Sequence, residues 1–238
     1  MSDNRAITLY DLVLASGVTL SPFVWRVKLA ILHKGFELNA VPTSYMDIKT
    51  ILDGTHTRLP VIEDAGKVVP DSVAIVDYLD ATYPDRPLLF RSKGERNFAR
   101  FLDGWMFQNV VRHWFSCYCL DQVHLSCPED KDYIRESRER LFLQGRRMED
   151  VVADREERLV EVRPNLDPIR SLLNESRWFA GDEPNHLDYL MLSHFLWCSS
   201  LATAPPLEQG DPLFDWLNRG FDLFNGIGRD ERLFPLAG

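Results

Sequence analysis

Residues 58–64 read Arg-Leu-Pro-Val-Ile-Glu-Asp, and residues 70–79 read Pro-Asp-Ser-Val-Ala-Ile-Val-Asp-Tyr-Leu. The first stretch indicates a strand that opens with a proline, which cannot donate a hydrogen bond to a sheet ladder at that position. A turn at Asp64-Ala65-Gly66-Lys67 joins it to a second short strand, so we expect an antiparallel hairpin. Asp71-Ser72 then begins a helix, which Pro84 ends.

The residues before this hairpin alternate between strand and helix patterns. Ile7–Tyr10 and Phe36–Val41 are β-rich or alternating and predict two further strands. Between them, Pro22 opens a helix that runs to about Lys34, with a glycine just past its end. We therefore predict that residues 1–90 form an α/β domain with four strands in one mixed sheet.

The chain after the polar, proline-containing linker at residues 85–94 has helical patterning. Apolar residues recur at helical spacing, and Leu187–Leu201 is so apolar that we expect it at the centre of its domain. The sequence therefore predicts an all-helical second domain, residues 91–238, with helices expected at 97–120, 130–147, 164–175, 187–201 and from 211 onward.

The charge balance limits the choice of partners. The 238 residues carry 27 basic and 36 acidic side chains, a formal net charge of −9, which disfavours phosphate backbones and anionic lipid surfaces. We find neither a membrane-length apolar run nor a secretory signal, so we expect a cytoplasmic protein without nucleic-acid or membrane partners. We expect no metal site and no redox pair, and hence four free thiols: Cys117, Cys119, Cys127 and Cys198.

Three positions admit both a structural and a chemical interpretation. Asp71 and Ser72 can cap their helix, or the helix N-terminus can receive an anion while Asp71 holds an ammonium group. Ser21 can cap the helix that Pro22 opens, or its hydroxyl can face a thiolate and lower the pKa of that thiol. A cis Leu59-Pro60 bond would expose the backbone before the proline to an extended ligand.

A strand that opens with such a proline and continues into a hairpin and a helix has the layout of a thioredoxin-like domain. In this order and spacing, the elements resemble the glutathione transferase superfamily, on Ser-Pro-Phe-Val-Trp-Arg-Val-Lys at 21–28 and the two stretches quoted first. Phe-Ala-Gly-Asp-Glu-Pro-Asn-His-Leu-Asp-Tyr at 179–189 resembles the family's capping box, with Asn185 as N-cap and Asp188 at the third helical position. The resemblance covers nearly the whole chain.

The resemblance implies glutathione as co-substrate and a role for each matching residue. Asp71 and Ser72 would hold its γ-glutamyl end, and the backbone at Leu59-Pro60 would pair with its cysteinyl part. A basic group would meet its glycine carboxylate: among Lys49, His56 and Arg58, we favour Arg58 with Lys49.

The sulfur would lie near Ser21, with Thr19 in the same loop as a partner or substitute. Redox members of the superfamily carry cysteine where this chain has Ser21. The resemblance therefore implies conjugation or substitution by the glutathione thiolate rather than disulfide exchange.

A closer resemblance is to the bacterial glutathione-dependent β-etherases of lignin breakdown and to the fungal etherase-like transferases. It rests on Ile-Thr-Leu-Tyr-Asp-Leu at 7–12, Trp-Phe-Ser-Cys-Tyr-Cys-Leu-Asp at 114–121, and the stretches 141–151 and 211–224. It implies that the thiolate attacks a carbon that bears an aryl ether beside a ketone. A phenol leaves, and a glutathione thioether remains.

Aromatic side chains offer a pocket for such a substrate. We favour Phe23, which follows Ser21 closely, and Trp114, Phe115 and Tyr118 from the stretch shared with β-etherases. The alternative is that aromatic residues on long helices pack in the core.

Two other functions stay open, because a fold alone does not choose between them. One is a broad detoxifying transferase, and the other is a non-catalytic carrier of hydrophobic ligands. Ser21, Asp71 and Ser72 disfavour the carrier, which needs no thiolate site. The superfamily also implies a two-fold homodimer, with the α/β domain of one subunit against the helices of the other.

Overall fold

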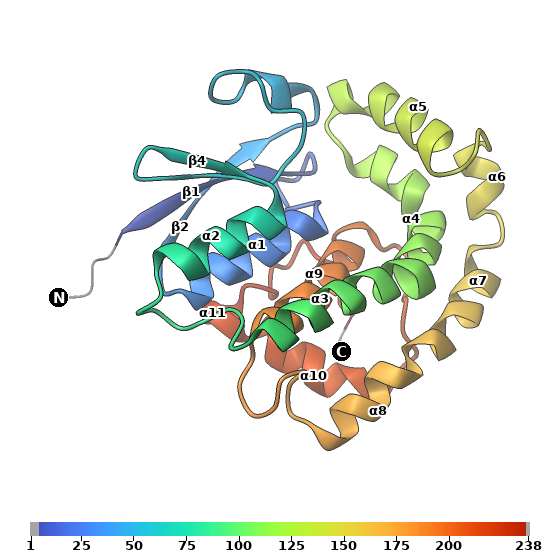
Figure 1. The fold of residues 1–238 in the computed structure, drawn as a ribbon. Coiled ribbons are helices and arrows are strands. Elements are labelled where there is room, and N and C mark those ends of the chain that lie inside the picture. The colour runs from blue at the N-terminus through green and yellow to red at the C-terminus, as the bar shows by residue number, and fades with distance from the viewer. Residues whose placement is uncertain (1–4, 237–238) are drawn as a thin grey trace.

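The computed structural model describes residues 5–236, in which a sheet-containing half is followed by a helical half (Figure 1). Four strands form one sheet in the order β2-β1-β3-β4. β1 (Ala6–Leu12) runs parallel to β2 (Glu37–Thr43) and antiparallel to β3 (Val61–Asp64), and β3 pairs antiparallel with β4 (Lys67–Pro70). The predicted mixed sheet and its hairpin are therefore confirmed.

Two helices connect this sheet to the rest of the molecule. α1 (Pro22–His33) contacts β1 and β2, α2 (Ser72–Thr82) contacts β3 and β4, and the two helices pack against each other. They lie between the sheet and the helical half (Figure 1). The segment after β2 forms a short 3-10 helix, η1 (Met46–Thr50). The bond between Leu59 and Pro60 is cis, as predicted.

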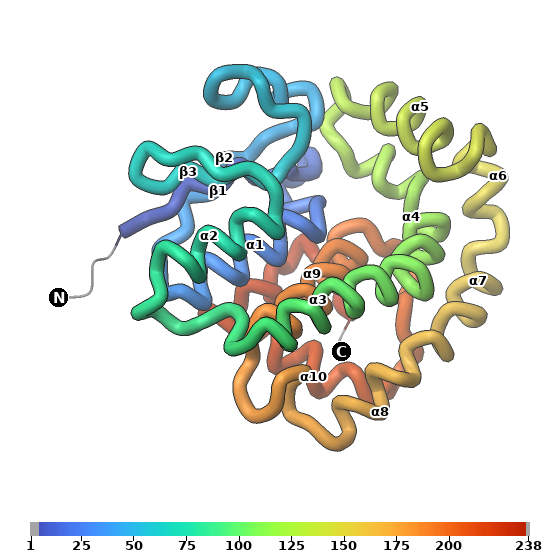
Figure 2. Tube along the Cα trace, viewed as in Figure 1, coloured from blue at the N-terminus to red at the C-terminus, as the bar shows by residue number. Residues whose placement is uncertain are grey.

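The second half is helical, as predicted, and is arranged around α9 (His186–Leu201). All residues of α9 are buried, and it contacts α1, α3, α4 and α10 (Figure 2). Its central place follows from its apolar sequence, which leaves no face for solvent. The remaining helices are α3 (Lys93–Met106), α4 (Arg112–Leu125), α5 (Lys131–Leu141), α6 (Met148–Val152), α7 (Arg155–Val162), α8 (Asp167–Glu175), α10 (Leu213–Phe221) and α11 (Leu223–Gly226).

Several helix boundaries differ from the predicted ones. The helix expected at 97–120 is a longer run in which a π-helical turn, Phe107–Val111, joins α3 to α4. The helix expected to reach Arg147 ends at Leu141, because Gln144 and Gly145 have positive φ angles of 56° and 80°, which a helix does not accommodate. The sequence did not predict α6 and α7, whose apolar stripes are short.

No helix within residues 5–236 is long and apolar enough to cross a membrane. The same residues contain no group of three or more His, Cys, Asp or Glu side chains that could hold a metal ion. The stretch between α2 and α3 contains neither helix nor strand, and we keep the division near residue 90 as our proposed domain boundary.

Candidate functional site

Ser21 immediately precedes the first turn of α1, and its hydroxyl can donate a hydrogen bond to a ligand. Ser21 has the extended backbone that a residue before proline adopts, with φ −85° and ψ 129°. The Val24 N–H donates to its Oγ at 3.4 Å, so Ser21 is the N-cap. Within residues 5–236, the Ser21 hydroxyl donates to no acceptor. Ser21 can therefore cap the helix and also donate to a thiolate, because in the cap its oxygen only accepts a hydrogen bond.

Thr19 differs from Ser21, because its hydroxyl is already fully engaged. It donates to Asp11 Oδ2 at 2.9 Å and accepts from the ammonium group of Lys28. Lys28 in turn forms a 2.6 Å ion pair with Asp11. Thr19 is only 3% exposed. Its hydroxyl belongs to a buried network that fixes the loop, and its proton is already donated to Asp11.

The cis peptide presents free backbone beside the start of α2. The Asp71 N–H donates to Pro60 O at 3.1 Å, which places the proline directly beside the helix N-terminus. Neither the N–H nor the C=O of Leu59 makes a backbone hydrogen bond within residues 5–236. An extended ligand can therefore pair with Leu59 as an added strand would.

Asp71 caps α2 with only half of its carboxylate. Its Oδ1 accepts from Val73 N at 2.9 Å and from Ala74 N at 3.1 Å, while Oδ2 has no partner in the described part of the chain. Its backbone is at φ 73° and ψ 130°, a sparsely populated region that non-glycine residues occupy only when their surroundings enforce it. The next residue, Ser72, is 5% exposed and lines a cleft together with Arg26 and Asp103.

Two exposed basic side chains lie in the connection between β2 and the cis-proline. Neither Lys49 nor Arg58 forms an ion pair within residues 5–236, although most arginines of this chain are paired with carboxylates. His56 lies 3.8 Å from Asp53 and is therefore less available to a ligand. Lys49 and Arg58 are thus the free cations of this segment, as an anion-binding role requires.

An aromatic cavity of about 680 Å³ opens at the start of α1. Phe23 lies on one side of it, and the α3 end and the π-helical turn supply the other walls. Its aromatic lining is Phe23, Phe101, Trp105 and Phe107, and its polar lining is Arg100, Asp103, Gln108, Asn109 and His194.

The other three predicted pocket residues do not line this cavity. Trp114 and Tyr118 are completely buried. Trp114 packs edge-on against Phe195 at 5.2 Å between ring centroids, and the Tyr118 hydroxyl donates to Ala204 O at 2.7 Å. Phe115 packs on Phe142. Trp114 and Tyr118 thus pack in the core and Phe115 is half-buried beside α5, so that Phe23 is the predicted pocket residue that lines this cavity.

Asp103, which lines the polar wall of the cavity, forms an ion pair with the buried Arg26. Arg26 donates to both carboxylate oxygens of Asp103, at 3.2 and 3.0 Å, and His194 Nε2 lies 3.3 Å from each partner. Although burial opposes it, hydrogen bonding from His194 and the charge of Arg26 lower the pKa of Asp103 well below its usual range. Burial lowers the pKa of His194, which keeps its imidazole neutral.

Arg100 is the cation that lines this cavity. It lines both the aromatic cavity and the cleft that includes Ser72, and its guanidinium makes no hydrogen bond or ion pair within residues 5–236. The sequence analysis did not select Arg26, Arg100, Asp103 or His194. The one available signal was Arg26 inside the otherwise apolar helix that follows Pro22, since an arginine on a buried face needs a partner.

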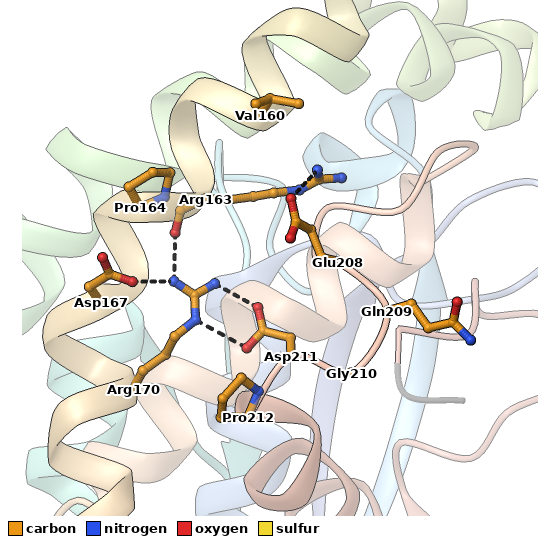
Figure 3. A pocket seen from close by; sticks show the side chains of 10 residues that line it. All are labelled: Val160, Arg163, Pro164, Asp167, Arg170, Glu208, Gln209, Gly210, Asp211 and Pro212. Atoms are coloured by element: carbon orange, nitrogen blue, oxygen red, sulfur yellow. Dashed lines mark hydrogen bonds and ion pairs between the residues drawn. The ribbon is translucent and has the colours of Figure 1, made fainter.

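A second cavity, of about 410 Å³, lies far from these residues between α7, α8 and the loop before α10 (Figure 3). Its main cation, Arg170, makes four hydrogen bonds: Asp211 accepts two at 3.1 and 2.6 Å, and Asp167 and the Arg163 carbonyl accept at 2.7 and 2.8 Å. Figure 3 shows this guanidinium surrounded by its acceptors. The charge of Arg170 is thus matched by carboxylates of the same cluster, which ties the helices and the loop together.

The fold joins a thioredoxin-like half, in which a cis-proline lies beside a helix N-terminus, to a helical half, and an aromatic cavity opens at the start of α1. Comparisons with known families agree: the glutathione S-transferase N-terminal domain matches residues 16–87, and the glutathione S-transferase C-terminal domain matches residues 97–207. The chain therefore belongs to the glutathione S-transferase superfamily.

Individual relatives are more distant. Glutathione S-transferase U3 of Arabidopsis thaliana is 32% identical over 99 residues, which is 40% of this chain and 44% of the relative. The chain thus matches less than half the length of its curated relatives.

Solved structures match over more of the chain. Glutathione transferase GSTFuA3 from Phanerochaete chrysosporium has a TM-score of 0.72 and 25% identity, covering 94% of this chain and 93% of that one. CsGST63524 of Ceriporiopsis subvermispora, solved in complex with glutathione, has a TM-score of 0.70 and 23% identity, covering 80% and 84%.

Proposed function

We propose that this protein is a glutathione transferase whose second substrate is an aromatic ether. One observation carries the glutathione part: Ser21, Leu59 and Asp71, on the elements that the superfamily uses, each keep a hydrogen-bonding group without a partner within residues 5–236, namely the Ser21 hydroxyl proton, the Leu59 backbone and Asp71 Oδ2. A ligand can therefore bond to each of them without breaking a hydrogen bond of the protein. A relative with the same fold is described in complex with glutathione.

Glutathione is bound from both ends in this proposal. Its γ-glutamyl ammonium meets Asp71 Oδ2, and its γ-glutamyl carboxylate meets Ser72 at the N-terminus of α2. Its cysteinyl part pairs with the Leu59 backbone. Its glycine carboxylate meets Lys49 and Arg58, the free cations of the neighbouring segment.

Ser21 acts on the sulfur. A thiol with a pKa of about 8.5 is mostly protonated at neutral pH. A hydrogen bond from the Ser21 hydroxyl to the thiolate, together with the N-terminus of α1, stabilises the charged form. Cys117 and Cys119 are unsuited to serve as the nucleophile in place of glutathione, since burial raises the pKa of both thiols to about 11.

The second substrate in this proposal is an α-aryloxy ketone, held in the aromatic cavity beside Phe23. The thiolate attacks the carbon next to the ketone, a carbon–sulfur bond forms, and the carbon–oxygen bond to the aryl group breaks. The aryloxide leaves with the negative charge that the thiolate brought. Arg100 is the unpaired cation of this cavity and can balance that charge.

Release of phenol tests this reaction directly. The protein is incubated with glutathione and a panel of α-aryloxy ketones, their alcohol counterparts and a simple electrophile that releases no aryloxide. We expect phenol from the ketones far faster than from the alcohols. Arg100→Met should slow phenol release about 10-fold more than it slows conjugation of the simple electrophile. Conjugation without phenol release from any ketone would instead support the broad detoxifying transferase.

We also propose a cytoplasmic homodimer. Val73 on α2 and Phe98 on α3 are 52% and 41% exposed, and one lies in each half of the chain. A two-fold axis can therefore place the α/β half of one subunit against the helices of the other. Light scattering at micromolar concentration measures the mass, and a single-chain mass would rule out the dimer.

A further inference from the structure

The segment that carries Lys49 is fixed at its start by an unusual set of hydrogen bonds. Residues 44–47 open the 3-10 helix η1. Ser44 Oγ donates to Asp47 Oδ2 at 2.8 Å and accepts from Asp47 N at 3.2 Å. The two preceding N–H groups, of Tyr45 and Met46, donate to Asp130 Oδ2 and Oδ1, both at 2.9 Å. Every N–H group of this first turn is thus satisfied.

Asp130 comes from the other half of the molecule. It ends the short turn Pro128–Asp130 that leads into α5, and it is completely buried. Within residues 5–236 it forms no ion pair with a lysine or arginine. A buried carboxylate without a cation is costly, so the two charge-assisted backbone hydrogen bonds are its main compensation.

Tyr45 is held by its side chain as well as by its backbone. Its hydroxyl accepts from Arg138 on α5 at 2.7 Å and from Gln122 on α4 at 3.1 Å. The Arg138 guanidinium also lies 5.1 Å from the centre of the Tyr45 ring. Burial raises the pKa of Tyr45, so its phenol stays neutral. The helical half therefore holds the start of η1 through two sets of hydrogen bonds, one to its backbone and one to the Tyr45 hydroxyl.

The rest of the segment has little structure of its own. Between Ile51 and the cis-proline the chain forms turns and bends, with positive φ angles of 51° at Leu52 and 76° at Gly54. Lys49 lies about one helical turn after Tyr45 and Met46. The hydrogen bonds at Tyr45 and Met46 consequently limit how far Lys49 can move in the absence of ligand. The segment then loses less conformational entropy when a ligand binds.

We propose that Asp130 is a positioning residue for glutathione, which holds η1 against the helical half so that Lys49 faces the glycine carboxylate. This inference rests on the proposed function. It adds a residue of the helical half to a site that otherwise belongs to the sheet-containing half.

The test compares Asp130→Asn with Asp132→Asn in the full-length protein. Asp132 is exposed on α5 and makes no hydrogen bond or ion pair within residues 5–236. We expect Asp130→Asn to raise the KM for glutathione about 10-fold and to leave kcat within about 2-fold, since the chemistry at the sulfur is untouched. Asp132→Asn should change neither constant.

A second background separates positioning from general damage. Lys49→Met removes the group that Asp130 is proposed to position, so in that background Asp130→Asn should raise KM by less than about 2-fold. An equal effect of Asp130→Asn with and without Lys49 would overturn the proposal. Arg138→Met, which loosens the same segment through Tyr45, provides a second variant if Asp130→Asn folds poorly.

Hydrogen exchange of residues 44–50 needs no glutathione and isolates the hydrogen bonds at Tyr45 and Met46. Asp130→Asn should speed exchange in this segment, while exchange in α9 stays unchanged. Unchanged exchange at 44–50 would overturn the proposal even if the protein binds glutathione. If calorimetry shows no glutathione binding to the wild-type protein, the proposed function fails on its own, and the positioning role of Asp130 fails with it.

Discussion

The N-termini of α2 and α9 are both capped by an Asp or Asn side chain, but the two caps differ in their burial and in the hydrogen bonds that they make. At α9, Asn185 Oδ1 accepts from Leu187 N, and Asp188 accepts from Phe179 N, Asn185 N and Trp216 Nε1 at 3.0, 3.3 and 3.1 Å. The predicted capping box is thus confirmed, and both of its residues are buried. At α2, Asp71 is exposed, and its Oδ2 has no partner among residues 5–236.

This difference separates a helix start that serves folding from one that can serve binding. Saturated acceptors in a buried cap have nothing left to offer a ligand, whereas a half-used carboxylate at an exposed cap can hold a cation. The first helical residues, Ser72 and His186, line the same cleft. The contrast therefore predicts that changes at α9 alter stability and that changes at α2 alter glutathione affinity.

The largest expected effect is the acid sensitivity of the α9 end. Burial lowers the pKa of His186 to about 3, and its Nδ1 has no partner in the described part of the chain. The unfolded value is about 6.5, so this neutral imidazole contributes stability that is complete above about pH 6.5 and is lost as the pH falls towards 3. At pH 4.5 the loss is roughly 2–3 kcal/mol.

His186→Phe checks this sign, because phenylalanine keeps the ring contact with Phe90 and cannot be protonated. Urea unfolding at pH 7.5 and 4.5 should show the wild type losing about 2–3 kcal/mol relative to the variant. Asp188 acts in the opposite direction, since burial raises its pKa to about 6, and the comparison with the variant cancels it. The exposed His124 provides a control for the loss of a surface histidine, as His124→Gln should change stability at pH 7.5 by less than about 0.5 kcal/mol.

The α2 end should respond in affinity instead. Asp71→Asn keeps the cap, because asparagine caps helices as well as aspartate and tolerates positive φ, but it removes the charge that would hold the γ-glutamyl ammonium. We expect stability to change by less than about 0.5 kcal/mol, and glutathione affinity to fall about 10- to 150-fold. Calorimetry and urea unfolding measure the two quantities.

Asp188→Asn is the mirror experiment. It replaces one buried acceptor by an amide N–H that faces other donors, so stability should fall by about 1–3 kcal/mol. Glutathione affinity of the folded protein should not change. If Asp188→Asn weakens glutathione binding as much as Asp71→Asn does, the two helix starts do not divide folding from binding.

The sequence predicted the parts of the fold that depend on local chemistry. The cis-proline, the hairpin and the Asn185 cap each rest on residues within a few positions of one another, and all three are present. The α/β order and the buried α9 follow from hydrophobic periodicity, which is also local. The place of Ser21 as an N-cap was likewise readable, because Pro22 follows it.

The sequence could not show which side chains meet across long distances. Trp114 and Tyr118 have the same character whether they line a pocket or fill a core, and only the orientation of α4 decides. Thr19 was equally ambiguous until Asp11 and Lys28 were placed around it. Asp130 caps backbone groups 84 and 85 residues away, and no periodicity signals such a contact.

The smallest expected effect concerns Ser21. Its cap is buried, as at α9, but like Asp71 at α2 it keeps a hydrogen-bonding group for a ligand. Ser21→Ala removes the hydroxyl proton that would stabilise the thiolate and also removes the acceptor for Val24 N. The first loss should raise the apparent pKa of bound glutathione, and the second should cost about 1 kcal/mol of stability. Turnover at neutral pH should fall about 10- to 100-fold, because the N–H groups of α1 still favour the thiolate.

The pH profile separates these two losses. If Ser21 acts on ionisation, the variant should recover part of its activity as the pH rises towards the thiol pKa, because the solvent then removes the proton that Ser21 no longer helps to release. A loss of folded protein would instead lower activity by the same factor at every pH. Thr19→Val is the matched control: it removes a hydroxyl from the same loop, and since that hydroxyl is committed to Asp11, it should reduce stability and leave the thiol pKa unchanged. A rate and pH profile that Ser21→Ala leaves untouched would assign the thiolate to the backbone N–H groups of α1, and α1 would then match α9, where the cap serves folding alone.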